Sequence, residues 1–154
     1  MIENSAFERR QIAQIVGASY ALVKNWSNGK TFEIIPSVKA PTERGATKLY
    51  SLSQVYLMAI TVSLKRQGMH PDFVRKLLPI LKSDWFRKEK RGIVIYGHST
   101  RGKVKAAHVM VGLRANPIAT VMYQSKAYVG GWLDLKRTLD HVDKMIEKKS
   151  WDLN

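Results

Sequence analysis

A glycine-containing turn between two short amphipathic segments constrains the fold of this 154-residue chain more than any other stretch. The pattern predicts one helix over residues 9–16 and a second over residues 20–28. Between them, Gly17 can take the positive φ that ends a helix without a Cβ clash, and Ser19 is a favourable N-cap. The apolar residues expected to pack the second helix against the first are Leu22, Val23 and Trp26.

This two-helix corner is typical of a helix-turn-helix, in which the second helix enters the major groove of DNA. The residues that follow favour a wing. They comprise a β-branched apolar stretch at 30–39, a turn segment at 41–47 and a return to strand character at 48–50. A basic loop of this kind can lie along a phosphate backbone or in the minor groove.

A longer helix is expected next. Ser51 and Gln54 have the spacing of a capping box and predict a helix to about Gln67, ended by Gly68. Because this helix is apolar on more than one face, it must be covered on both sides, either by the C-terminal segment or by a second subunit. Pro71 fits the first turn of a further helix, whose buried stripe would be Val74, Leu77, Leu78 and Leu81.

In this order of elements, roughly residues 7–81 resemble the MerR family of winged-helix transcriptional regulators. The motifs that carry the resemblance are Gln11-Ile12-Ala13, Gly17-Ala18-Ser19, Lys24-Asn25-Trp26, Lys48-Leu49-Tyr50, Gln67-Gly68-Met69-His70 and the run from Asp72 to Leu78. The resemblance implies a homodimer, joined through a C-terminal helix, that binds double-stranded DNA and regulates transcription. Some members of the family respond to a small-molecule effector. The chain departs from the family at Lys24 and Lys48, where arginine is usual, and in its longer wing.

The second half predicts a smaller module. Strands are expected at 93–96, 106–111 and 118–123, with a fourth at 128–133. Asp134 can cap a final helix to about Lys149, whose apolar residues follow a two-heptad seam: Leu135, Leu139, Val142 and Ile146. This seam fits either a dimer interface or packing onto the small sheet.

The expected fold class is therefore α+β, in two domains. Residues 1–83 would form a MerR-like winged helix-turn-helix, and residues 84–154 a small β-sheet module with a C-terminal helix that dimerises or receives an effector. The recognition helix would be 20–28, and the wing 30–50.

The charge of the chain indicates a polyanionic partner. Lysine and arginine number 26 against 12 acidic residues, which gives a net charge of +14. Residues 1–83 and 84–154 each carry +7, so the excess is not confined to a basic tail. No charged segment at the start leads into an apolar run, and the nearly uncharged run at 49–64 is too short and too polar to span a membrane. We expect a cytoplasmic protein associated with the nucleoid.

The candidate DNA-contacting residues lie on the second helix and along the wing. Asn25 can pair with adenine, Lys24 can bind guanine or the backbone, and Tyr20 and Ser19 can reach phosphates. The family resemblance adds Tyr50, whose hydroxyl would contact a phosphate beside Lys48. The complete set is Ser19, Tyr20, Lys24, Asn25, Lys30, Lys39, Arg44, Lys48 and Tyr50.

Sites of other kinds are poorly supported. Residues 97–103 match the spacing of a phosphate-binding loop, but Val104 stands where a magnesium-binding Ser or Thr is needed, which favours a hairpin turn. The four histidines have no partners at metal-binding spacing, and the absence of cysteine excludes disulfides, thiol catalysis and thiolate metal sites. With no nucleophile–base pattern visible, we expect neither an enzyme nor a cofactor.

Two other functions remain open. An excisionase-like or otherwise architectural protein of a phage or mobile element would use the same winged helix to bend DNA, without preference for a promoter. An RNA-binding protein would instead use the basic sheet, with Tyr96, Tyr123 and Tyr128 as stacking platforms.

Overall fold

The computed structural model describes the chain over the following residues: 6–28, 32, 34, 49–69, 71, 74–75, 78–79, 93–98, 106–110 and 129–148. For 93–98, 106–110 and 129–132 it describes the backbone alone. The chain divides into two compact units, residues 1–62 with 139–154, and residues 63–138. The expected domain boundary between residues 83 and 84 lies outside the described residues.

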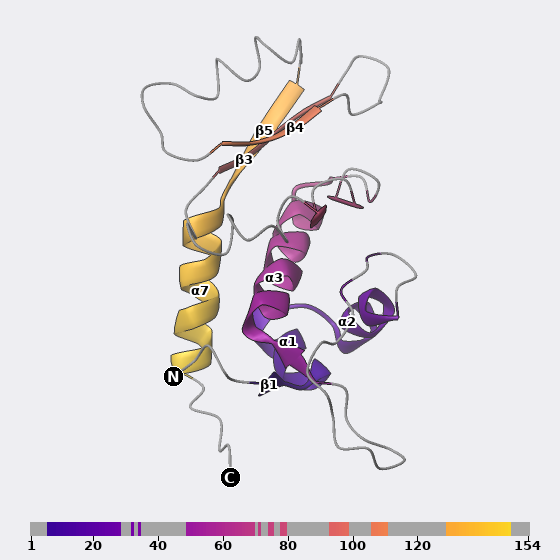
Figure 1. Ribbon diagram of the computed structural model, residues 1–154, viewed down its shortest axis with the longest axis vertical. Coiled ribbons are helices and arrows are strands. Elements are labelled where there is room, and N and C mark those ends of the chain that lie inside the picture. The colour runs from indigo at the N-terminus through magenta and orange to yellow at the C-terminus, as the bar shows by residue number, and fades with distance from the viewer. Residues whose placement is uncertain are drawn as a thin grey trace. The chain divides into compact units, whose positions relative to one another are not determined.

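The described part is mostly helical, with small antiparallel sheets (Figure 1). In chain order its elements are β1 (Ala6–Phe7), α1 (Arg9–Val16), α2 (Tyr20–Ser27), β2 (Tyr50–Ser51), α3 (Leu52–Arg66), β3 (Ile93–His98), β4 (Ala106–Met110), β5 (Val129–Asp134) and α7 (Leu135–Lys148).

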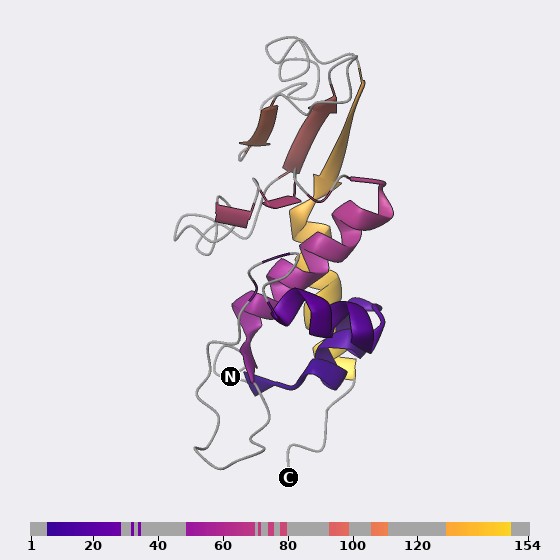
Figure 2. The ribbon, with the colours of Figure 1, turned by 90° about the vertical axis from the view of Figure 1, so that its right-hand side faces the viewer.

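The first two helices lie side by side and are bounded by the local chemistry that the sequence predicts (Figure 2). Gly17 ends α1 in the left-handed region, with a φ of 65°. Ser19 caps α2, because its Oγ accepts a hydrogen bond of 3.2 Å from the backbone N–H of Leu22. The helix expected at 9–16 is confirmed, and the one expected at 20–28 ends one residue earlier, at Ser27.

The core between these helices is apolar. On α1 it consists of Ile12, Ala13, Ile15 and Val16. From α2 it receives Val23 and Trp26, and the Trp26 ring meets Phe32 edge-on at 5.3 Å between centroids. The expectation that Leu22 packs against α1 is wrong, since Leu22 is 37% exposed. Successive helical residues are about 100° apart, so Leu22 falls beyond the edge of the side formed by Val23 and Trp26.

A two-stranded antiparallel sheet joins the start of α1 to the start of α3. β1 pairs with β2 so that Phe7 lies opposite Tyr50 and Ala6 opposite Ser51. The sequence indicates a strand near Tyr50, but it gives no sign that residues 6–7 supply the partner strand. Both aromatic side chains of the Phe7–Tyr50 pair are buried.

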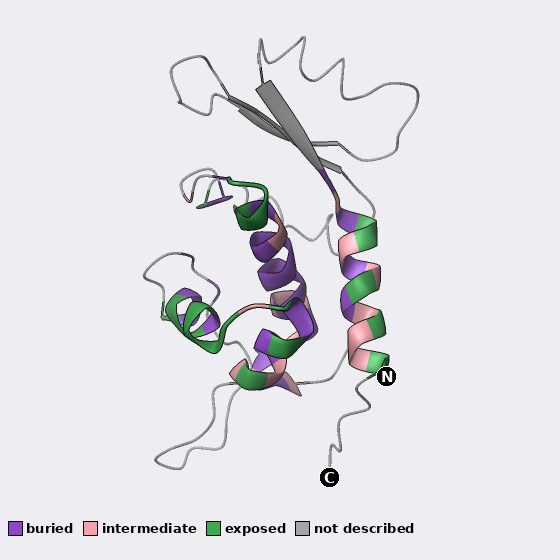
Figure 3. Ribbon diagram, turned by 180° about the vertical axis from the view of Figure 1, so that it is seen from behind, coloured by how far each residue is buried: buried purple, intermediate pink, exposed green. Residues whose placement is uncertain are grey.

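Helix α3 is buried on nearly all sides, as its sequence requires (Figure 3). At its start, one half of the predicted capping box is confirmed, since the backbone N–H of Ser51 donates to Oε1 of Gln54 at 2.9 Å, while the Ser51 hydroxyl pairs with that of Ser53. Gly68 follows the end of the helix with a φ of 79°. The hydroxyl of Tyr56 donates to Oδ1 of Asp143 on α7. The C-terminal segment therefore contributes to the cover of this helix within a single chain.

Two buried polar side chains satisfy their hydrogen bonds inside their own helices. The Ser27 hydroxyl donates to the carbonyl of Val23, and the Thr61 hydroxyl donates to the carbonyl of Leu57, both at 2.7 Å. Neither hydroxyl draws on a neighbouring element for these bonds.

The second unit contains a three-stranded antiparallel sheet in the order β4-β3-β5. Ile93 lies opposite Met110 on one side and opposite Asp134 on the other. The strands expected at 93–96, 106–111 and 128–133 are confirmed with small shifts in their ends, whereas the one expected at 118–123 lies outside the described residues.

Helix α7 begins where the sequence places it, because Asp134 Oδ1 accepts a 2.9 Å hydrogen bond from the backbone N–H of Arg137. Its apolar stripe is covered in the single chain: Leu135, Leu139 and Val142 are buried, and Ile146 is half-buried. Residues 139–148 belong to the unit that contains α1 and α2. Leu139 and Val142 are therefore already covered within one chain, and no second subunit is needed to bury them.

Candidate functional site

The exposed side of α2 is the surface that the sequence singles out for binding. Helical spacing places Ala21, Asn25 and Asn28 furthest from the buried side, and all three are exposed. Lys24 and Tyr20 form one flank of this face, and Leu22 forms the other. Tyr20, at 46% exposure, and Leu22 are the large hydrophobic side chains that protrude from the described surface.

Four of the predicted contact residues share this region. Lys24 and Asn25 are exposed on consecutive positions of α2, Tyr20 opens the helix, and Ser19 precedes it. The Ser19 hydroxyl is engaged as the helix cap, although a hydroxyl can still donate its own proton elsewhere. Within 6–28 the chain carries three basic side chains against one acidic side chain, Glu8. The local charge is therefore positive.

Tyr50 is placed differently from the expectation. Its side chain has 0% exposure, so the structure does not present its hydroxyl to a phosphate. The hydroxyl instead accepts a 3.2 Å hydrogen bond from Nε of Arg9. The pairing of β2 with β1 is the physical reason, because it turns Tyr50 inward opposite Phe7.

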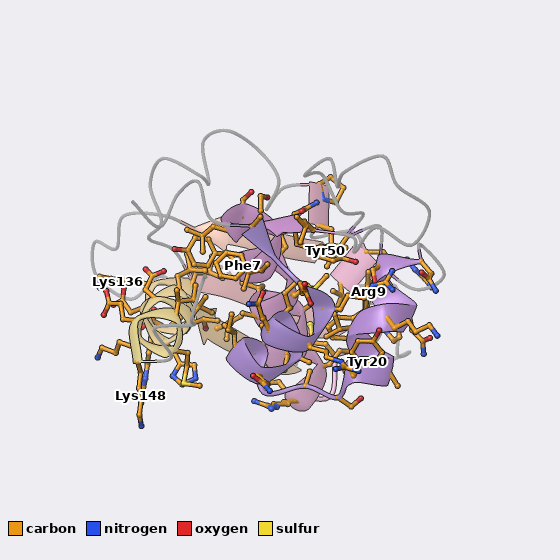
Figure 4. The ribbon with its side chains drawn as sticks, turned by 90° about the horizontal axis from the view of Figure 1, so that it is seen from below. Phe7, Arg9, Tyr20, Tyr50, Lys136 and Lys148 are labelled. Atoms are coloured by element: carbon orange, nitrogen blue, oxygen red, sulfur yellow. The ribbon has the colours of Figure 1, made fainter. Side chains whose placement is uncertain are left out.

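Arg9 is the residue that sequence reasoning missed. It lies at the first position of α1, half-buried, with Tyr50 on one side and Tyr20 on the other (Figure 4). The hydrogen bond to Tyr50 raises the pKa of the Arg9 guanidinium, burial opposes this shift, and interactions with Tyr20 add to it. No local pattern identifies Arg9, because its hydrogen-bond partner Tyr50 is 41 residues away in the chain.

The wing residues Lys30, Lys39, Arg44 and Lys48 lie outside the described residues, as do Tyr123, Tyr128 and residues 99–105 of the glycine-rich segment. Tyr96 lies on β3, for which the backbone alone is described. The predictions made for these residues stay predictions.

The part of the chain that the structure describes holds no group of three or more His, Asp or Glu side chains placed to bind a metal ion. No helix there combines the length and the apolar character needed to cross a bilayer.

Comparison of the chain with models of protein families and with curated proteins gave no match.

Proposed function

We propose that this chain binds double-stranded DNA sequence-specifically and regulates transcription, using α1 and α2 as the helix-turn-helix of a MerR-like winged fold. The observation that carries the proposal is the exposed polar face of α2, opposite the side that packs on α1. A helix anchored along one side in this way can enter a major groove with its other side free to meet the bases.

The chemistry of that face suits base recognition. The Asn25 amide can donate to and accept from adenine at N6 and N7, and Lys24 can donate to guanine or to a phosphate. Around the helix, Ala21 lies between Lys24 and Asn25. Its small side chain permits a close approach of the helix to the base edges. Both α1 and α2 lack acidic residues, so a phosphate backbone meets little repulsion from them.

The proposed assembly is a homodimer, because palindromic operators are bound by two recognition helices at a fixed spacing. We propose that its interface does not include Leu139 and Val142, because these residues are already buried within one chain. A small-molecule effector that binds the second unit would complete a MerR-like regulator.

Selection of bound duplexes from a random pool, followed by sedimentation of the winning complex, tests the proposal. A palindromic consensus bound by two chains is expected. Binding without a consensus would instead support the architectural, excisionase-like function, and preference for single-stranded RNA over duplex DNA would support the RNA-binding one.

Substitution of the two central polar residues should weaken binding to the selected duplex. We expect Lys24→Ala and Asn25→Ala each to cost about 1–3 kcal/mol of binding free energy, and Asn25→Ala also to relax the preference at one base pair. Titration by fluorescence anisotropy measures both effects. Lys144→Ala on α7 is the matched control, since it removes the same charge from another exposed helical position. Equal affinity of Lys24→Ala, Asn25→Ala and wild type would exclude α2 as the reading helix.

A further inference from the structure

The side chain of Arg9 is positioned by a hydrogen bond to Tyr50, and its backbone follows directly on the strand that pairs with Tyr50. Its Nε donates to the Tyr50 hydroxyl at 3.2 Å, and Phe7, two residues earlier, pairs with Tyr50 in the β1–β2 sheet. Because Tyr50 is fully buried, its hydroxyl is a fixed point rather than a mobile surface group. The guanidinium is thus oriented before any ligand arrives, which reduces the ordering entropy that a long side chain loses on binding.

The donors left on Arg9 suit a phosphate. A guanidinium has five N–H groups, of which the Tyr50 bond uses the one on Nε. The two terminal nitrogens carry the other four, and a hydrogen bond to Tyr20 would still leave enough to bind two oxygens of one phosphate side by side. A lysine at this position would supply charge without the planar fork.

Arg9 also continues a row of side chains along α2. Tyr20 and Lys24 are four residues apart and so lie on the same side of the helix, and Arg9 is adjacent to Tyr20 (Figure 4). We call Arg9, Tyr20 and Lys24 the cationic edge. This edge flanks the outermost face of α2, as the backbone of one DNA strand flanks a major groove that holds a helix.

We infer that the cationic edge binds phosphates of one DNA strand beside the groove that α2 occupies, with Arg9 as its principal phosphate contact and Tyr50 as the residue that positions Arg9. This inference rests on the proposed function and deepens it. Tyr50 then contributes to DNA binding through Arg9 alone and does not touch the nucleic acid.

The test measures affinity for the selected duplex over a range of salt concentrations, with the full chain, four single variants and one double variant. Arg9→Gln should weaken binding about tenfold at low salt and reduce the slope of log affinity against log salt by about 1, because one phosphate neutralisation is lost. It should weaken binding to specific and unrelated duplexes alike, since phosphates carry no sequence. Arg10→Gln removes the same charge from the neighbouring exposed position and should change the slope less.

Tyr50→Phe separates positioning from direct contact. The variant keeps the buried ring and the Arg9 charge, so we expect weaker binding with a nearly unchanged salt slope. Combined with Arg9→Gln, it should cause no further loss of affinity, because the group that Tyr50 orients is already gone. Thermal unfolding of each variant in the absence of DNA identifies any general loss of fold. Arg9→Lys should recover the slope but only part of the affinity.

The outcomes separate the inference from the proposed function. If Lys24→Ala weakens binding while Arg9→Gln leaves both affinity and slope unchanged, the proposed function stands and the role of Arg9 is wrong. If Tyr50→Phe costs as much in the Arg9→Gln background as in wild type, Tyr50 acts independently and is not a positioning residue. If the wild-type chain binds no duplex at all, the proposed function and the inference both fail.

Discussion

Replacement of Trp26 by alanine should lower the free energy of unfolding by about 3–5 kcal/mol, the range for removal of a large buried aromatic side chain. Trp26 is 2% exposed and contacts the edge of the Phe32 ring, so its loss leaves a cavity between α2 and the residues that follow it. Urea unfolding followed by circular dichroism measures the change.

Leu22→Ala is the control for Trp26→Ala. It removes an apolar side chain from the same helix, but Leu22 is more than a third exposed and does not share the buried side. Its effect should stay within about 0.5 kcal/mol, as is usual for surface positions. Similar losses of stability for the two variants would contradict the burial of Trp26 and the orientation of α2 that depends on it.

Leu139→Ala is expected to lower the free energy of unfolding by about 2–5 kcal/mol, because Leu139 is 2% exposed within the single chain. The stability difference between wild type and variant should be the same at low and high protein concentration. A seam that joined two subunits would behave otherwise, since a dimer gains stability with concentration by mass action. Chemical unfolding at two widely separated concentrations makes the measurement.

His141→Ala provides the comparison for Leu139→Ala on the exposed side of α7 and should change stability little. If the effect of Leu139→Ala grew or vanished with protein concentration, the stripe would be an intersubunit contact and its burial within one chain would be wrong.

Helix boundaries were predictable because they depend on neighbouring residues. Gly17, Ser19, Gln54 and Asp134 act within three or four residues of their own position, and each has the predicted conformation or hydrogen bond. The error at Leu22 arose because apolar character alone does not say where the buried side of a helix ends. The edge of the buried side is set by how Val23 and Trp26 pack in the folded chain, which the sequence of the helix alone does not show.

The candidate site was predictable on α2 and not beyond it. Exposure of Lys24 and Asn25 follows from helical spacing once Trp26 is assigned to the core. Tyr50 and Arg9 could not be assigned in this way, since their contact depends on a sheet that pairs residues more than 40 positions apart. Pairings of that kind leave no periodic trace in the sequence.

The internal hydrogen bonds of Ser27 and Thr61 affect which interactions set the packing of their helices against neighbouring elements. Each hydroxyl is satisfied within its own helix by these bonds, so neither demands a matching polar group across the interface. Near Ser27 and Thr61, the packing of one helix against its neighbours therefore depends on the shapes and volumes of apolar side chains. Volume-conserving changes among the surrounding residues are then the kind of sequence variation that this core can absorb.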